Sequence, residues 1–158
     1  MPTVYIGRCR SYALVVVDAA VRLAVLALGG IERFVRPGMR VLIKPNLLLA
    51  KAPETAIDTH PAVVQAVASL VREAGARAII ADSPGGGTGF NPRGLRALYR
   101  VSGLEPVAEA SGAELNMDCE ALQVPCPEGR LVHMLDVIRP ATQADAIINL
   151  PKLKTHGL

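Results

Sequence analysis

Arg40-Val41-Leu42-Ile43-Lys44-Pro45-Asn46 contains the clearest strand in the chain and also shows where that strand ends. Residues 40–43 form an apolar run, and Pro45 cannot extend a central ladder, so the chain leaves the sheet there. Residues 78–81 and 146–150 repeat this pattern of an aliphatic run that stops at polar residues. Uninterrupted aliphatic runs are typical of parallel strands that helices cover on both faces.

Helical patterns separate these strands. Thr59-His60-Pro61 opens a predicted helix that runs to about Ala74, with a hydroxyl cap and an early proline. Asn91-Pro92 opens another, and residues 14–28 form a third that stops at paired glycines. Strands alternating with helices predict an α/β fold with a mainly parallel sheet flanked by helices.

Two further elements complete this prediction. Residues 3–7 have the pattern of a short strand, and residues 120–138 that of a hairpin excursion around Pro125 to Arg130. We expect residues 1–158 to form a single α/β domain, the front part of a longer domain.

Composition narrows the classes of function. The formal net charge is only +3, and the arginines are scattered along the chain. Two Phe, three Tyr and no Trp leave few aromatic rings for base stacking. We therefore expect no binding of nucleic acid. Three cysteines without a C-x-x-C pair encode no complete metal or iron-sulfur site. No export signal or membrane span is apparent, and we expect a cytoplasmic protein with idle thiols.

Polar residues follow each predicted strand. In an open parallel sheet the ligand crevice lies beyond the carboxyl ends of the strands, so these residues are the candidate site. They are Lys44 and Asn46 after the strand at 40–43, Asp82, Ser83, Gly85, Gly86 and Gly87 after the strand at 78–81, and Lys152, Lys154 and His156 after the strand at 146–150.

The Gly-rich loop suits an anion, because its backbone N–H groups can approach closely and a helix follows it. It matches no nucleotide-binding fingerprint, and a flexible turn explains the glycines equally well. Asn46 either holds its loop by local hydrogen bonds or binds ligand.

The charged residues also have alternative roles. Lys44 either reaches solvent or meets an anion, and Asp82 pairs with Lys44, caps loop amides, or acts as a base or metal ligand. Lys152, Lys154 and His156 bind a polyanion or supply an activated amine and a proton carrier, unless they form a solvated tail.

Three ordered motifs resemble the family called domain of unknown function 362. They are Val41 to Leu47, Asp82 to Gly85, and Asn149 to His156. The resemblance implies a shared site at these lysine, aspartate and histidine positions, but no established reaction. Members of that family usually continue further, and many carry a ferredoxin-like iron-sulfur module, which implies a truncated chain here.

We therefore predict an enzyme domain that binds a small phosphate- or carboxylate-bearing substrate or cofactor. The binding residues would be Lys44, Asn46, Ser83, Gly85, Gly86, Gly87 and Lys152, and the catalytic ones Asp82, Lys154 and His156, with no metal. The alternative is a non-catalytic docking or regulatory partner of an iron-sulfur electron-transfer module.

Overall fold

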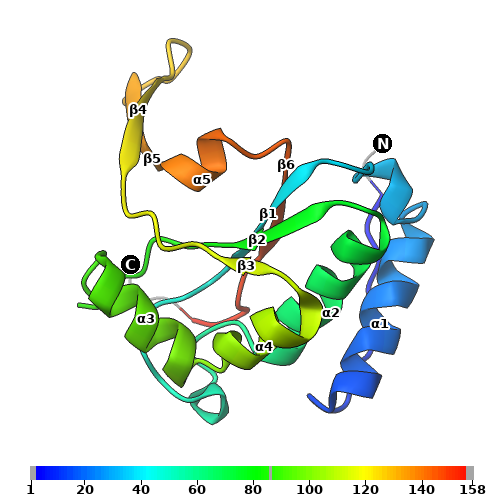
Figure 1. The fold of residues 1–158 in the computed structure, drawn as a ribbon. Helices are drawn as coiled ribbons and strands as arrows, with labels where there is room; N and C mark the ends of the chain where they lie inside the picture. The colour runs from blue at the N-terminus through cyan, green and yellow to red at the C-terminus, as the bar shows by residue number, and fades with distance from the viewer. Residues whose placement is uncertain (1–2, 86, 156–158) are drawn as a thin grey trace.

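In the computed structural model, the described residues are 3–85 and 87–155. Four parallel strands form the main sheet in the order β3-β2-β1-β6, and two antiparallel strands form a separate hairpin (Figure 1). The strands are β1 (Arg40–Pro45), β2 (Arg77–Ile80), β3 (Glu114–Leu115), β4 (Ala121–Pro125), β5 (Met134–Ile138) and β6 (Ala146–Leu150).

The helices connect these strands in a simple succession. They are α1 (Leu14–Ala27), α2 (Pro61–Glu73), α3 (Pro92–Val101), α4 (Leu104–Ser111) and α5 (Arg139–Thr142), with short 3₁₀ turns η1 (Ile31–Arg33) and η2 (Pro53–Thr55). The chain steps from β1 to β2 to β3 and then returns past β1 to form β6. The direction of strand addition therefore reverses between β1 and β6, which makes the gap between their carboxyl ends the topological switch point of the sheet.

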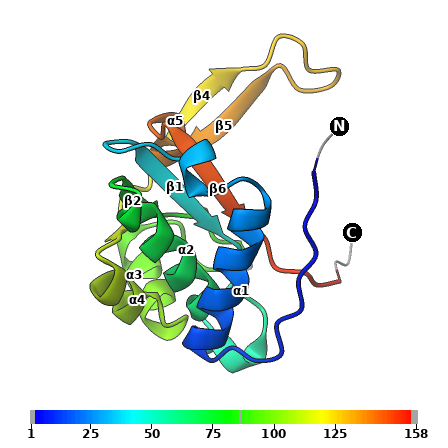
Figure 2. The same ribbon diagram turned by 90° about the vertical axis from the view of Figure 1, so that its right-hand side faces the viewer.

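The main core lies between the sheet and the helices on one of its faces. Val41 and Ile43 of β1 pack there with Val64 of α2 and Leu98 of α3, all at most 1% exposed. Alternate residues point to the other face, where Leu42 and Ile147 lie beside the hairpin and α5. Figure 2 shows α1 beside α2, and the hairpin of β4 and β5 projecting away from these helices.

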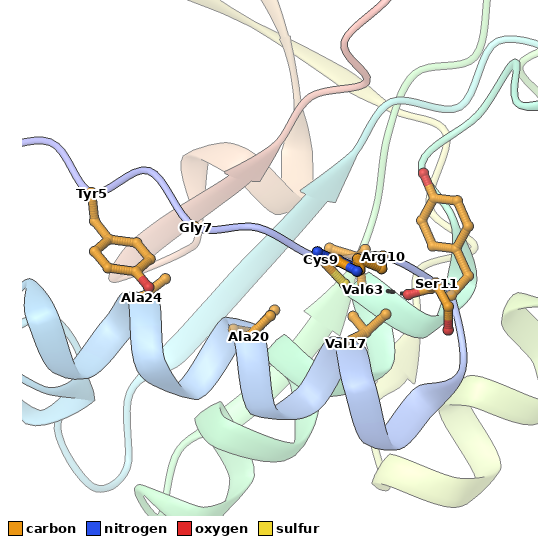
Figure 3. A pocket seen from close by; sticks show the side chains of 11 residues that line it. Tyr5, Gly7, Cys9, Arg10, Ser11, Val17, Ala20, Ala24 and Val63 are labelled. Atoms are coloured by element: carbon orange, nitrogen blue, oxygen red, sulfur yellow. Dashed lines mark hydrogen bonds between the residues drawn. The ribbon is translucent and has the colours of Figure 1, made fainter.

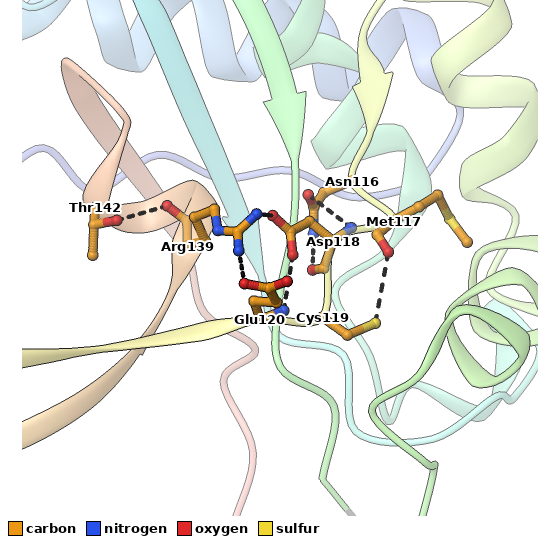
Figure 4. A network of polar contacts seen from close by, with 7 residues as sticks. All are labelled: Asn116, Met117, Asp118, Cys119, Glu120, Arg139 and Thr142. Atoms are coloured by element: carbon orange, nitrogen blue, oxygen red, sulfur yellow. Dashed lines mark hydrogen bonds and ion pairs between the residues drawn. The ribbon is translucent and has the colours of Figure 1, made fainter.

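An arginine ties the hairpin to the rest of the domain. The guanidinium of Arg139 lies 3.0 Å from the Asp118 carboxylate and also pairs with Glu120, while its backbone N–H donates to the Glu120 carbonyl (Figure 4). Asn116 folds its side chain over Asp118, and the buried Tyr99 hydroxyl donates to the Asn116 carbonyl at 2.8 Å. The exit from β3 is thereby fixed on both sides.

The predicted fold class is confirmed, including the parallel sheet and the hairpin. The strand expected at residues 3–7 is wrong: this segment is extended, but no described strand pairs with it. The cap of α2 also differs, because the Nδ1 atom of His60, rather than the Thr59 hydroxyl, accepts the Ala62 N–H. That domain 1–158 is the front of a longer domain stays a prediction.

Two matched leucines test the placement of the core. Leu98 of α3 is fully buried, whereas Leu26 of α1 is 70% exposed. Leu98→Ala should lower the free energy of unfolding by about 2–5 kcal/mol through lost burial and a residual cavity. Leu26→Ala should change it by less than about 0.5 kcal/mol. Urea denaturation of both variants measures the difference, and equal losses would contradict this core.

Candidate functional site

The three strands β1, β2 and β6 end at the same edge of the sheet, as their parallel register requires. Here the Lys44 ammonium lies 2.7 Å from the Asp82 carboxylate, whose second oxygen accepts the Leu47 N–H at 2.8 Å. Asp82 is nearly inaccessible to solvent, while Lys44 is partly exposed. Lysine pairing, one of the alternatives for Asp82, is therefore what the structure shows.

A second buried carboxylate organises the loop after β1. One oxygen of Asp58 accepts the N–H groups of Leu48 at 2.6 Å and Leu49 at 3.4 Å. Its other oxygen is buried and has no hydrogen-bond partner among the described atoms. Burial raises the pKa of Asp58 above its ordinary value, although the two N–H groups and the ammonium of Lys154 oppose this shift.

Thr59 joins the two strands of the switch point. Its hydroxyl accepts the Asn46 N–H at 2.9 Å and donates to the Leu150 carbonyl at 2.7 Å. The Thr59 N–H in turn donates to the Asn46 carbonyl. The Asn46 side chain lies within 3.5 Å of the Ile57 carbonyl, which fits its expected role of holding the loop. These bonds fix the ends of β1 and β6 relative to each other.

Lys152 lies in a different environment from Lys44. Its ammonium is 3.4 Å from the Tyr12 hydroxyl and 5.6 Å from the centre of that ring. Tyr12 stacks on His60, with ring centroids 3.9 Å apart and planes inclined by 9°. In the part of the chain that the structure describes, Lys152 forms no ion pair with a carboxylate.

Tyr12, His60 and Lys152 border a hollow of about 470 Å³ beside the carboxyl end of β6. It is lined by Tyr12, Thr59, His60, Val63, Asn149, Leu150, Pro151, Lys152 and Leu153. Burial, and secondarily the Lys152 ammonium, lower the pKa of His60, so its imidazole is neutral at pH 7. Because Nδ1 accepts the Ala62 N–H, the proton of the neutral ring is on Nε2.

The start of the Gly-rich loop lies beside Lys44. Ser83 and Lys44 line a separate hollow of about 300 Å³ beneath the hairpin, together with Asp136. Gly87 has a φ of +88°, which favours glycine, and a Cβ on Gly85 would stand 3.0 Å from the Leu48 side chain. Backbone geometry therefore explains Gly87, and the Leu48 side chain crowds Gly85, while Gly86 lies outside the described residues.

The structure thus divides the predicted site. It brings Lys44, Asp82 and Ser83 together, and it places Lys152 beside Tyr12 and His60. The Lys154 ammonium donates to the Ile57 carbonyl at 3.2 Å, close to Asp58. His156 lies outside the described residues. Among residues 3–85 and 87–155, no group of three His, Cys, Asp or Glu side chains could hold a metal ion.

The sequence did not indicate Asp58, Tyr12 or the place of His60 beside the hollow. Asp58 and His60 flank Thr59 in an Asp-Thr-His run just before a helix, which is a signal of a polar loop end. Tyr12 carried no such signal, because it is brought to the site only by the path of residues 5–12 alongside α1 (Figure 3).

The fold and the edge define a class: a parallel α/β domain with lysines and carboxylates gathered at its switch point. Residues 41–158 match the family described as domain of unknown function, DUF362. This match covers most of the chain, so the chain belongs to that family, as its three motifs predicted.

A curated relative extends the comparison to the N-terminal part. The chain is 36% identical over 153 residues to a thylakoid-associated protein, sll1697, of Synechocystis sp.. The match covers 95% of the chain but only 44% of that protein, so the chain spans less than half of the relative's length. No solved structure matches this chain.

Among the described residues, no helix is long and apolar enough to cross a membrane.

The two lysines should respond differently to substitution. Lys44→Met leaves the buried Asp82 carboxylate without its counter-ion, so it should lower the free energy of unfolding by about 1–3 kcal/mol. Lys152→Met removes no ion pair and should change stability by less than about 0.5 kcal/mol. Chemical denaturation at neutral pH compares them, and an unchanged stability of Lys44→Met would refute the structural role of this pair.

Asp58 should make stability depend on pH. A carboxyl group whose pKa is raised by folding stabilises the protein fully below its unfolded pKa, and this contribution is lost as the pH rises through the folded pKa. Asp58→Asn keeps a carbonyl oxygen for the Leu48 N–H but cannot ionise. The free energy of unfolding of Asp58→Asn minus that of the parent should therefore be larger at about pH 7 than at about pH 4, because only the parent loses stability as this carboxyl ionises. Denaturation curves at both values measure this difference, and a pH-independent difference would count against the buried carboxyl.

Proposed function

We propose that this chain is an enzyme domain that binds a small anionic substrate or cofactor, bearing a phosphate or carboxylate, at the carboxyl end of β6, beside the switch point. The observation that carries the proposal is the Lys152 ammonium, which borders a hollow there and is paired with no carboxylate of the described residues. Crevices at this position of an open parallel sheet are where such folds bind their ligands.

The groups around Lys152 form a matched set of donors. The ammonium supplies charge, the Nε2–H of the neutral His60 ring supplies a directional donor, and the Tyr12 hydroxyl supplies another. His60 also caps α2, so its ring is held in place by the Ala62 N–H before any ligand arrives. Preorganised donors of this kind bind anions without a cost of rearrangement.

Proton transfer falls more naturally to Asp58 than to Asp82. Both oxygens of Asp82 are engaged, by Lys44 and by the Leu47 N–H. Asp58 has an oxygen without a partner and a raised pKa, and Lys154 lies close to it. A carboxyl group with a raised pKa holds its proton to a higher pH than an ordinary one, which suits it to proton transfer. His156 stays a prediction for the same role.

We propose that Lys44 acts mainly in structure, because it is paired with Asp82. Its counter-ion is already present, so it contributes less free charge than the sequence suggests. Ser83, Gly85 and Gly87 border this part of the edge, and we propose that they shape its rim. The alternative role, as a docking partner of an iron-sulfur module, stays a prediction because no observation on the described residues favours it.

Calorimetric titration tests the proposal with acetate, inorganic phosphate and a panel of phosphorylated and carboxylated metabolites. Lys152→Met should weaken binding by about 1–3 kcal/mol, the scale of a charge-assisted hydrogen bond. Lys51→Met is the matched control, because Lys51 is exposed and does not line this hollow. Equal affinities of the parent and Lys152→Met would refute the site.

A further inference from the structure

A second, apolar hollow adjoins the anion site. Residues 5–12 run in extended form alongside α1 and leave a slot of about 430 Å³ between them (Figure 3). On the side of α1 the wall is built from small and medium aliphatic residues, and Tyr5, Gly7, Cys9, Arg10, Ser11 and Tyr12 form the other side. In Figure 3 Ser11 lies near Val17 at one end and the Tyr5 ring near Ala24 at the other.

The slot and the anion hollow share two residues, Tyr12 and Val63, so the two spaces are adjacent. Tyr12 stands between them: it stacks on His60, and its hydroxyl is 3.4 Å from the Lys152 ammonium. A ligand whose charged group meets Lys152 would have to pass Tyr12 and Val63 to reach the wall of α1.

The chemistry of the lining identifies the ligand class. Arg10 and Lys152 are the charged residues in the two linings, which contain no aspartate or glutamate among the described residues. The α1 wall of Val17, Ala20, Val21 and Ala24 is entirely apolar. Such a surface attracts an anionic group at one end and removes apolar surface from water along its length.

We propose that the anion bound at Lys152 carries an aliphatic chain, and that this chain lies in the slot between residues 5–12 and α1. This inference rests on the function proposed above and narrows its substrate class to amphiphilic carboxylates or phosphates. Ala20 and Ala24 determine how much chain the slot admits, because a larger side chain at either position would occupy the space. Ala20 lies midway along the wall and Ala24 at the end near Tyr5 (Figure 3).

A series of saturated monocarboxylates, from acetate through butanoate and hexanoate to octanoate, tests the slot by calorimetric titration. Affinity should rise by about two- to fourfold for each methylene group added, because each one leaves water for the apolar wall. Lys152→Met should weaken every member of the series by a similar factor, since all share the carboxylate. An affinity that does not increase with chain length would overturn the inference.

Three Ala→Leu variants of α1 locate the chain. Ala20→Leu should lower the ratio of octanoate to acetate affinity by about tenfold or more, because it fills the middle of the slot. Ala24→Leu should reduce the affinity for octanoate more than for butanoate, since it shortens the slot at its far end. Ala19→Leu is the control: Ala19 is exposed and lines neither hollow, so both ratios should match the parent.

The outcomes separate the two proposals. If acetate and phosphate bind through Lys152 and chain length has no effect, the slot is not a ligand site and the proposed function stands. If neither the carboxylates nor the phosphates bind, the proposed function fails and the inference fails with it. Melting temperatures identify a variant that does not fold, and Ala24→Leu then tests the slot even if Ala20→Leu is lost.

Discussion

The hydroxyl of Thr59 is the contact on which the candidate site depends. It accepts a hydrogen bond from the end of β1 and donates one to the end of β6, so a single side chain spans the point where the sheet changes direction. The connections of parallel strands diverge at a switch point, and Thr59 adds a side-chain link where the ladder between β1 and β6 ends. Thr59 is also next to Asp58 and His60, so the same backbone places a buried carboxyl and an N-cap imidazole at the edge.

The sequence predicted the parts of the structure that depend on local patterning. Aliphatic runs that end in Lys44, Asp82 and Lys152 gave the strands, and parallel pairing then required these residues to share an edge. The pairing of Lys44 with Asp82 was one of the stated alternatives and needed coordinates to select it. The short β3 was missed, because two residues carry too little pattern to indicate a strand.

Other features depend on tertiary contacts that no local pattern records. Residues 3–7 have strand-like composition, yet a strand needs a neighbour, and the described residues provide none beside them. Tyr12 reaches Lys152 across 140 positions of sequence, so its role could only come from the fold. The N-cap of α2 also depends on tertiary contacts. The Thr59 hydroxyl is hydrogen-bonded to the ends of β1 and β6, so His60 rather than Thr59 accepts the Ala62 N–H.

The family match covers only part of the proposed site. The match begins at residue 41, so it includes Asp58, His60 and Lys152 but excludes residues 5–12 and α1. The proposed anion contacts therefore come mainly from the part that defines the family, whereas the apolar wall comes from the preceding segment. This separation follows from the fold, because Lys152 closely follows β6, whereas no described residue of α1 lines the anion hollow.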